Sequence, residues 1–252
     1  MERAVEISDL VKCYEDEAVL KNLELKIPKG TIFGLIGPNG AGKSTLIGVL
    51  TGLLSFEAGE ILIHGMKLNP KNELEIKRVT ASVLQPPLLF EQFSSLEFIE
   101  YVCEIYEVEK EGLIEKAYSL MDYFDIKDFA KIKVNKLSSG SRKKLAFVTA
   151  VLVEPQLLLL DEPFEAVDVI SIERMKNVIR KLKVKGVTII VTSHILEVVE
   201  NLCDDIAILH NGKIKAYLDS VSRKELQKDS SLHEIFEQYV EVEKKDKIVD
   251  WL

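Results

Sequence analysis

The segment GPNGAGKST, from Gly37 to Thr45, matches the pattern GxxxxGK[ST]. It lies between an apolar run, TIFGLIG, and a helical pattern, STLIGVLTGLL, that begins at Ser44. Glycines let the backbone turn its N–H groups inward around phosphate oxygens, and the helix presents its positive N-terminal end to the same anion. Lys43 can reach the β and γ phosphates, and the Ser44 hydroxyl can bind Mg²⁺. The stretch therefore predicts a nucleotide-phosphate site between a strand and a helix.

A pair of acidic residues follows a second apolar run far downstream. The run LLLLD ends at Asp161, and Glu162 comes next. At the end of a buried strand, Asp161 can hold Mg²⁺ through water and Glu162 can polarise an attacking water molecule. Such a pair is more often a solvated turn, but beside a phosphate loop it favours nucleotide hydrolysis. GTP is disfavoured, because NKLS at 135–138 has serine where a guanine-binding NKxD motif needs aspartate.

The apolar runs around these motifs predict a parallel α/β fold. LLLLD (157–161) and VTIIVT (187–192) are continuously apolar, as in parallel strands that are covered on both faces. Between them lies a helical pattern that Gly186 would end, and its inner face is formed by Ile172, Met175, Val178, Ile179 and Leu182. Strand, helix and strand in this order make a βαβ unit.

Antiparallel pairing is expected near both ends of the chain. Leu23, Leu25 and Ile27 alternate with charged residues, as in a half-buried antiparallel strand. The dipeptide Asn211-Gly212 joins two apolar-patterned runs, and this pair suits a type I′ turn. We therefore expect a strand before the phosphate loop and a hairpin after the βαβ unit.

A helical insert and a helical tail complete the predicted organisation. From 86 to 135 the pattern is helical, and one helix is expected to begin at Ser94, with Glu97 completing a capping box. After Asp219 the chain is more charged and mostly helical in pattern, and we interpret it as an appendage.

Composition and charge exclude several functions. The 252 residues are 47% hydrophobic and 29% charged, as in ordinary globular proteins, and the net charge of −8 argues against a primary role on nucleic acid. The start, MERAVEISDL, lacks the apolar stretch of a secretory signal, and no apolar run is long enough to span a membrane. Cys13, Cys103 and Cys203 are widely spaced, which indicates reduced thiols and no metal site.

Together these motifs resemble the ATP-binding cassette (ABC) ATPases over residues 3 to about 218. Three single residues also stand at the family's positions: Tyr14 for an aromatic that stacks on adenine, Gln85 for the glutamine loop, and His194 for the switch histidine. The resemblance implies that ATP is bound by Tyr14 and by Gly37, Asn39, Gly40, Ala41, Gly42, Lys43, Ser44 and Thr45. It implies that Mg²⁺ is held by Ser44, Gln85 and Asp161, and that catalysis involves Glu162, His194, Lys43 and Gln85.

The string LSSGSRKKL, at 137–145, is similar to the family signature, which is commonly LSGGQ. Ser138 and Gly140, the direct phosphate contacts in the family, are present, whereas Ser139 and Ser141 replace glycine and glutamine. At a helix start, a hydroxyl and backbone N–H groups can bind an anion. In the family, two cassettes pair head to tail, and each signature closes on the γ-phosphate held by the partner.

The resemblance also implies a domain organisation. The dimer-contact loop EAVDV keeps Asp168, but Ala166 and Val169 stand where glycine and proline are frequent, so contact between subunits is expected to be tuned differently. The implied fold is a P-loop NTPase (RecA-like) core with an N-terminal antiparallel β subdomain and an α-helical subdomain inserted at about 86–150. We expect one ABC ATPase domain over 1–220 and a C-terminal helical extension over 221–252.

By resemblance, the chain is an ATPase subunit that dimerises around two ATP molecules, with an identical or a different second cassette, and drives a separate integral membrane permease. Leu88, Leu89, Phe90 and Phe93 are apolar enough to receive a coupling helix of that permease, or else they pack inside the insert. The linker PFEAV and the tail SLHEIFEQYV look like those of single-cassette bacterial exporters.

We then expect a cytoplasmic protein that lies on the inner face of the cell membrane through its permease, with no nucleic-acid partner. The alternative is a soluble ABC ATPase of an assembly machine, such as one of iron–sulfur cluster biogenesis, which would use the same clamp to deform a protein scaffold.

Overall fold

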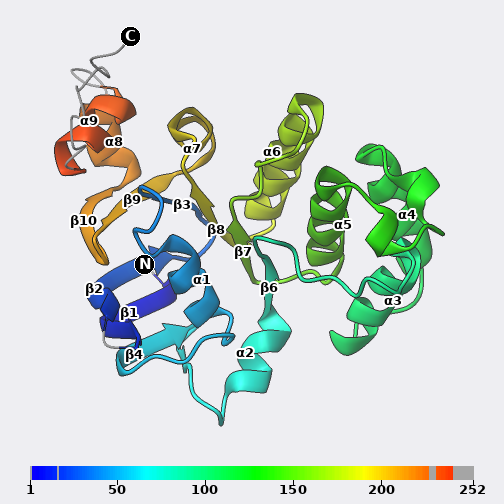
Figure 1. Ribbon diagram of the computed structural model, residues 1–252, viewed down its shortest axis with the longest axis horizontal. Coiled ribbons are helices and arrows are strands. Elements are labelled where there is room, and N and C mark those ends of the chain that lie inside the picture. The colour runs from blue at the N-terminus through cyan, green and yellow to red at the C-terminus, as the bar shows by residue number, and fades with distance from the viewer. Residues whose placement is uncertain (1, 16, 227–230, 241–252) are drawn as a thin grey trace, which may run out of the picture.

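The computed structural model describes residues 2–15, 17–226 and 231–240, whose strands form two sheets (Figure 1). A four-stranded antiparallel sheet has the order β2-β1-β4-β5, from Glu17–Pro28, Arg3–Tyr14, Ala58–Ile63 and Met66–Lys67. A six-stranded sheet has the order β10-β9-β3-β8-β7-β6, from Lys213–Leu218, Asp205–His210, Ile32–Ile36, Thr188–Ser193, Leu157–Asp161 and Thr80–Val83. Its pairs are parallel except for the β9–β10 hairpin.

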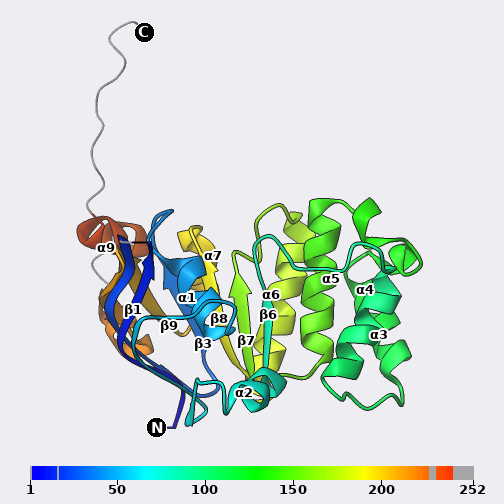
Figure 2. The same ribbon diagram turned by 60° about the horizontal axis from the view of Figure 1, so that its bottom comes forward.

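Nine helices accompany the two sheets in the described residues. In sequence order they are α1 (Lys43–Leu50), α2 (Glu73–Val79), α3 (Ser95–Ile105), α4 (Leu113–Tyr123), α5 (Ser139–Leu152), α6 (Val169–Val184), α7 (Leu196–Leu202), α8 (Ser220–Leu226) and α9 (Leu232–Tyr239). Short 3₁₀ turns occupy Lys127–Phe129 and Val134–Lys136. Figure 2 shows α3, α4, α5 and α6 at one end of the molecule and the antiparallel sheet at the other.

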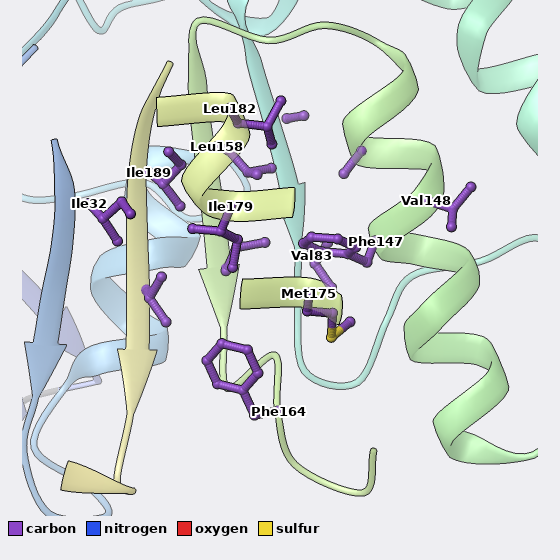
Figure 3. Packing of buried hydrophobic residues seen from close by; sticks show 14 of the residues in the cluster. Ile32, Val83, Phe147, Val148, Leu158, Phe164, Met175, Ile179, Leu182 and Ile189 are labelled. Carbon is purple, nitrogen blue, oxygen red and sulfur yellow. The ribbon is translucent and has the colours of Figure 1, made fainter. Parts of the chain in front are cut away.

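The central strands β3, β8 and β7 of the six-stranded sheet are buried on both faces, as the continuous apolar runs of β7 and β8 predict. In β7, Leu157 and Leu159 pack with α1 and the antiparallel sheet, whereas Leu158 and Leu160 pack with the helices of the opposite face. Figure 3 shows that opposite face, where Leu158 lies against Ile179 of α6. This two-sided burial confirms the predicted parallel α/β core.

The structure confirms three local features predicted from the sequence: a helix cap, a hairpin turn and a helix end. Ser94 caps α3, and Glu97 completes the capping box. Asn211 and Gly212 have φ values of 51° and 76°, as a type I′ turn requires. Gly186, at a φ of 90°, follows the end of α6, and the predicted βαβ unit is β7-α6-β8.

The helix after the phosphate loop is shorter than predicted. The apolar pattern extends to Leu54, but α1 ends at Leu50. Gly52 adopts a φ of 73°, and the Leu54 N–H donates to the Gly48 carbonyl oxygen at 3.0 Å, so the chain folds back on its own last turn. A glycine in the left-handed conformation is a common way to end a helix. The prediction was wrong because Leu54 packs on the helix from outside it.

The end of the described chain packs against the core. Leu232 and Ile235 of α9 and the following Val240 are buried in the same cluster as the helices, and α9 contacts α7 and β9. Residues 227–230 and 241–252 of the predicted C-terminal extension lie outside the described residues. Among the cysteines, Cys103 and Cys203 are buried, and all three are free thiols.

Candidate functional site

Most of the predicted site residues follow strands that end along one edge of the six-stranded sheet. The strands β3, β8, β7 and β6 are neighbours in this order. They lead into the phosphate loop, His194, the pair Asp161 and Glu162, and Gln85, respectively. Because parallel strands end at the same edge, these segments, which are far apart in the sequence, meet at one place.

The phosphate loop is held by tight packing on its inner side. A Cβ atom on Gly37 would lie 2.2 Å from the Leu209 carbonyl oxygen, and one on Gly42 would lie 2.8 Å from the Leu20 side chain. Gly40 and Gly42 have φ values of 80° and 108°, in the region that favours glycine. On the outer side, a Cβ on Gly40 would meet nothing within 4 Å. The loop is therefore fixed on β9 and β2 while its outer face stays open to a ligand.

Lys43 is a buried cation at the base of this loop. Its Nζ donates to the Gly37 carbonyl oxygen at 2.7 Å and to the Pro38 carbonyl oxygen at 3.3 Å, and lies 3.8 Å from Glu162 Oε1. Burial lowers the pKa of Lys43, while the carboxylates of Glu162 and Asp161 oppose that change. A buried ammonium between loop carbonyls and two carboxylates is suited to exchange these partners for phosphate oxygens.

The Glu162 carboxylate is held by contacts with neighbouring residues. Its side chain is 12% exposed, and Oε2 lies 2.9 Å from His194 Nδ1 and accepts from the His194 backbone N–H at 3.3 Å. Its backbone adopts a φ of 46°, which is uncommon for a residue other than glycine. The carboxylate thus lies between Lys43 and His194, where it can orient water.

Thr192 holds the acidic pair and was not identified from the sequence. Its hydroxyl donates to Asp161 Oδ1 at 2.6 Å and accepts from the Glu162 backbone N–H at 3.0 Å. Thr192 and Asp161 are almost fully buried. The only sequence signal was a polar residue at the end of the apolar run VTIIVT, which alone indicates no partner.

We expect Thr192→Val to lower the free energy of unfolding by about 1–3 kcal/mol, because it leaves a buried carboxylate oxygen and a buried N–H without a partner. Hydrolysis should fall as well, since both acidic residues lose their support. Thr192→Ser keeps the hydroxyl and should retain most of both. Urea denaturation and phosphate release check this expectation, and equal stability of the valine and serine variants would contradict it.

Gln85 and Tyr14 lie at the margin of this cluster. The Gln85 side chain donates to the carboxylate of Glu165, in the linker that follows Glu162. Tyr14 ends β1 and is 46% exposed, and the Lys12 ammonium lies 5.5 Å from its ring centroid. Since the hairpin of β1 and β2 also carries Leu20, which packs at Gly42, it lies beside the phosphate loop. The roles of both residues with Mg²⁺ and adenine stay predictions.

The signature string and the dimer-contact loop form a second cluster. Ser138 caps α5, since its Oγ accepts from the Ser141 N–H at 3.2 Å. Asp168 caps α6 and lies 2.8 Å from Lys144 Nζ. Hydrogen bonds from Lys144 and Ser171 hold the pKa of Asp168 well below its usual range. Figure 1 shows α5 beyond α6, on the side away from α1, so one chain carries two separate parts of the predicted clamp.

A divalent cation would have to share this site with phosphate. The described residues contain no group of three or more His, Cys, Asp and Glu that could hold a metal. Ser44 at the start of α1 and Asp161 offer oxygen ligands, and Mg²⁺ usually takes few protein ligands beside substrate phosphates. The residues present therefore fit Mg²⁺ that arrives with a nucleotide.

A phosphate loop between a parallel strand and a helix, with a buried lysine and an acidic pair at the same sheet edge, defines the P-loop NTPases. Residues 20–165 match the family model described as ABC transporter. The chain belongs to this family. It is an ATP-binding subunit that hydrolyses ATP with Mg²⁺.

Similar proteins support this assignment along most of the chain. The lantibiotic transport ATP-binding protein SrtF of Streptococcus pyogenes is 32% identical, over 96% of this chain and 99% of its own length. A structure described as the ATP-binding subunit of an ABC transporter superposes with a TM-score of 0.87 at 30% identity, covering 94% and 99% of the two chains. A dimer of the cassette MJ0796 with ADP and Pi, in a post-hydrolysis state, gives 0.78 at 26% identity, covering 86% and 98%.

Among the helices that the structure describes, none combines the length and apolar character needed to cross a lipid bilayer.

Proposed function

We propose that this chain pairs with a second cassette, identical or different, around two ATP molecules and hydrolyses them at the edge formed by β3, β8 and β7. The observation that carries this proposal is the position of the Glu162 carboxylate, with Lys43 Nζ at 3.8 Å and His194 Nδ1 at 2.9 Å. Glu162 acts as the base that orients and deprotonates water. His194 keeps that carboxylate in place and supports the γ-phosphate.

The phosphate loop binds the triphosphate through its backbone N–H groups and Lys43. The contributing residues are Gly37, Asn39, Gly40, Ala41, Gly42, Lys43, Ser44 and Thr45, and Tyr14 stacks on adenine. Ser44, Asp161 and Gln85 would hold the Mg²⁺ that arrives with the nucleotide, and the ion would neutralise negative charge on the phosphates. The open outer face at Gly40 and the buried ammonium support this assignment.

The second cluster acts on the nucleotide of the other subunit. Ser138 and Gly140 lie at the N-terminal end of α5, and Asp168 lies at the N-terminal end of α6. The N-terminal end of α5 is positively polarised and capped by a neutral hydroxyl, so it favours an anion such as a γ-phosphate, whereas the end of α6 is already capped by the Asp168 carboxylate. ATP therefore joins the two subunits, and hydrolysis releases them.

An apolar groove is the surface we assign to the permease. A cavity of about 390 Å³ lies between α2, α3, α5 and β6. Leu88 at its rim is 67% exposed, and the nearby Phe90 is 52% exposed, whereas Leu89 and Phe93 pack against the core. Two of the four predicted apolar residues, Leu89 and Phe93, are therefore structural, whereas Leu88 and the outer face of Phe90 are exposed and can receive a coupling helix.

We further propose that the permease is an exporter and that the cargo is a peptide of the lantibiotic type. The named activity of SrtF supports this substrate class. The chain would then lie in the cytoplasm, on the inner face of the membrane. The relatives' transport names favour this function over the assembly-machine alternative.

We expect Leu88→Glu to weaken binding of the permease roughly 30-fold or more in Kd, because burying a carboxylate in an apolar interface costs about 2 kcal/mol or more. The two proteins would be coexpressed, extracted in detergent and purified through a tag on this chain. Val184→Glu is the matched control, since Val184 is 88% exposed and does not line the groove.

Equal capture by the Leu88→Glu and Val184→Glu variants would remove the groove from the interface. Capture of a soluble assembly scaffold in place of a membrane protein would support the assembly-machine alternative. The ATPase rate of the isolated variants should match that of the unmodified chain, which separates docking from hydrolysis.

A further inference from the structure

Lys143, in the basic part of the signature string, has a contact that the proposed mechanism does not use. It lies on α5 and is 5% exposed. Its Nζ donates to the backbone carbonyl oxygen of Glu162 at 2.8 Å. Burial lowers the pKa of Lys143, while the carboxylates of Glu165, Glu162 and Asp161 oppose that change. A buried lysine needs a reason, because the ammonium loses its water.

The reason lies in the backbone of Glu162. This residue comes directly after the last residue of β7 and adopts a φ of 46°, so its main chain leaves the sheet in a conformation that is unfavourable for a side-chain-bearing residue. The Thr192 hydroxyl accepts its N–H, and Lys143 donates to its carbonyl oxygen. Both polar groups of the Glu162 main chain are thus held by side chains from other elements.

The same helix is tied to the linker after Glu162 at two further points. Lys144 Nζ lies 2.8 Å from Asp168 Oδ2. A Cβ on Gly140 would lie 2.7 Å from the Ala166 carbonyl oxygen, so the first turn of α5 lies directly on the linker backbone. The segment 162–168 therefore contacts the start of α5 at both of its ends and near its middle.

We propose that Lys143 is a positioning residue for hydrolysis, which fixes the main chain of Glu162 to the helix that carries the signature. The inference rests on the proposed role of Glu162 as the base. Its consequence is directional coupling: when Ser138 and Gly140 close on the nucleotide of the partner subunit, they move the helix that orients Glu162 in their own subunit. Each nucleotide would then be sensed by the hydrolytic residue of the opposite site.

The test is Lys143→Met, which keeps the length and volume of the side chain but removes the donor. Loss of a charged hydrogen bond to Glu162 is expected to lower kcat for ATP about 10-fold or more, with KM changed less than about 2-fold. Lys143→Arg retains a charged donor and should restore most of kcat. Lys181→Met, at an exposed lysine of α6, is the matched control and should behave as the unmodified chain.

Affinity for ATP and the midpoint of thermal unfolding are measured on the same proteins. Unchanged kcat in Lys143→Met would overturn the inference, and so would a parallel loss of ATP affinity and thermal stability in both Lys143 variants, which indicates a structural role only. The proposed function is tested separately by Glu162→Gln. If that variant loses turnover and Lys143→Met does not, Glu162 is the base and Lys143 does not position it.

Discussion

Glu162→Gln is expected to reduce ATP turnover at least about 100-fold while ATP binding persists. The amide keeps the shape of the side chain and its contact with His194, but it cannot take a proton from water. Because hydrolysis is what releases the two subunits, ATP with Mg²⁺ should then accumulate a stable dimer. Phosphate release measures the first effect, and size-exclusion chromatography with ATP or ADP measures the second.

Glu197→Gln is the matched control for this experiment. It makes the same chemical change on an exposed residue of α7, three positions after His194. Turnover of that variant should equal that of the unmodified chain. Hydrolysis at the unmodified rate by Glu162→Gln would show that Glu162 is not the base, and a strict monomer with ATP, in the presence of any natural second cassette, would contradict the clamp.

Lys43→Ala is expected to weaken ATP binding by about 1.5–3 kcal/mol, or roughly 10- to 150-fold in Kd, because it removes a charged donor to the phosphates. It also leaves the carboxylates of Asp161 and Glu162 without the nearby cation, and these would then repel the triphosphate. Binding of a fluorescent ATP analogue and isothermal titration with ATP measure this loss. Turnover should fall with it.

Two further variants separate binding from folding. Lys43→Met keeps most of the side-chain volume, so a loss of affinity shared by Lys43→Ala and Lys43→Met follows from the charge. Lys176→Met changes a lysine of α6 that pairs with Glu173 outside the site, and it should bind ATP normally. Unchanged ATP affinity in Lys43→Met would exclude the phosphate loop as the triphosphate site.

Much of the fold could be predicted because its signals are local. The capping box at Ser94, the turn at Asn211-Gly212 and the apolar run before Asp161 depend on neighbouring backbone or on burial of one short segment. The length of α1 could not be predicted in the same way, because Leu54 continues the helical pattern while it packs from outside the helix.

The same distinction between local and long-range signals applies to the residues of the candidate site. Lys43 and the acidic pair belong to motifs whose chemistry is contained in a few consecutive residues. Thr192 and Lys143 carry no such pattern, and their partners lie 31 and 19 positions away, so only the packing of β8 against β7 and of α5 against the linker reveals them.

Glycine spacing and continuous apolar runs act over a few residues, and they are sufficient to predict a phosphate loop, a parallel core and an acidic pair. Which side chains meet depends instead on the packing of elements that are distant in the sequence. The strand order places His194 beside Glu162, and the packing of α5 places Lys143 Nζ against the Glu162 carbonyl oxygen. These distances depend on how sheets and helices assemble. The same packing places Leu89, partly buried, against the core and leaves Leu88 exposed.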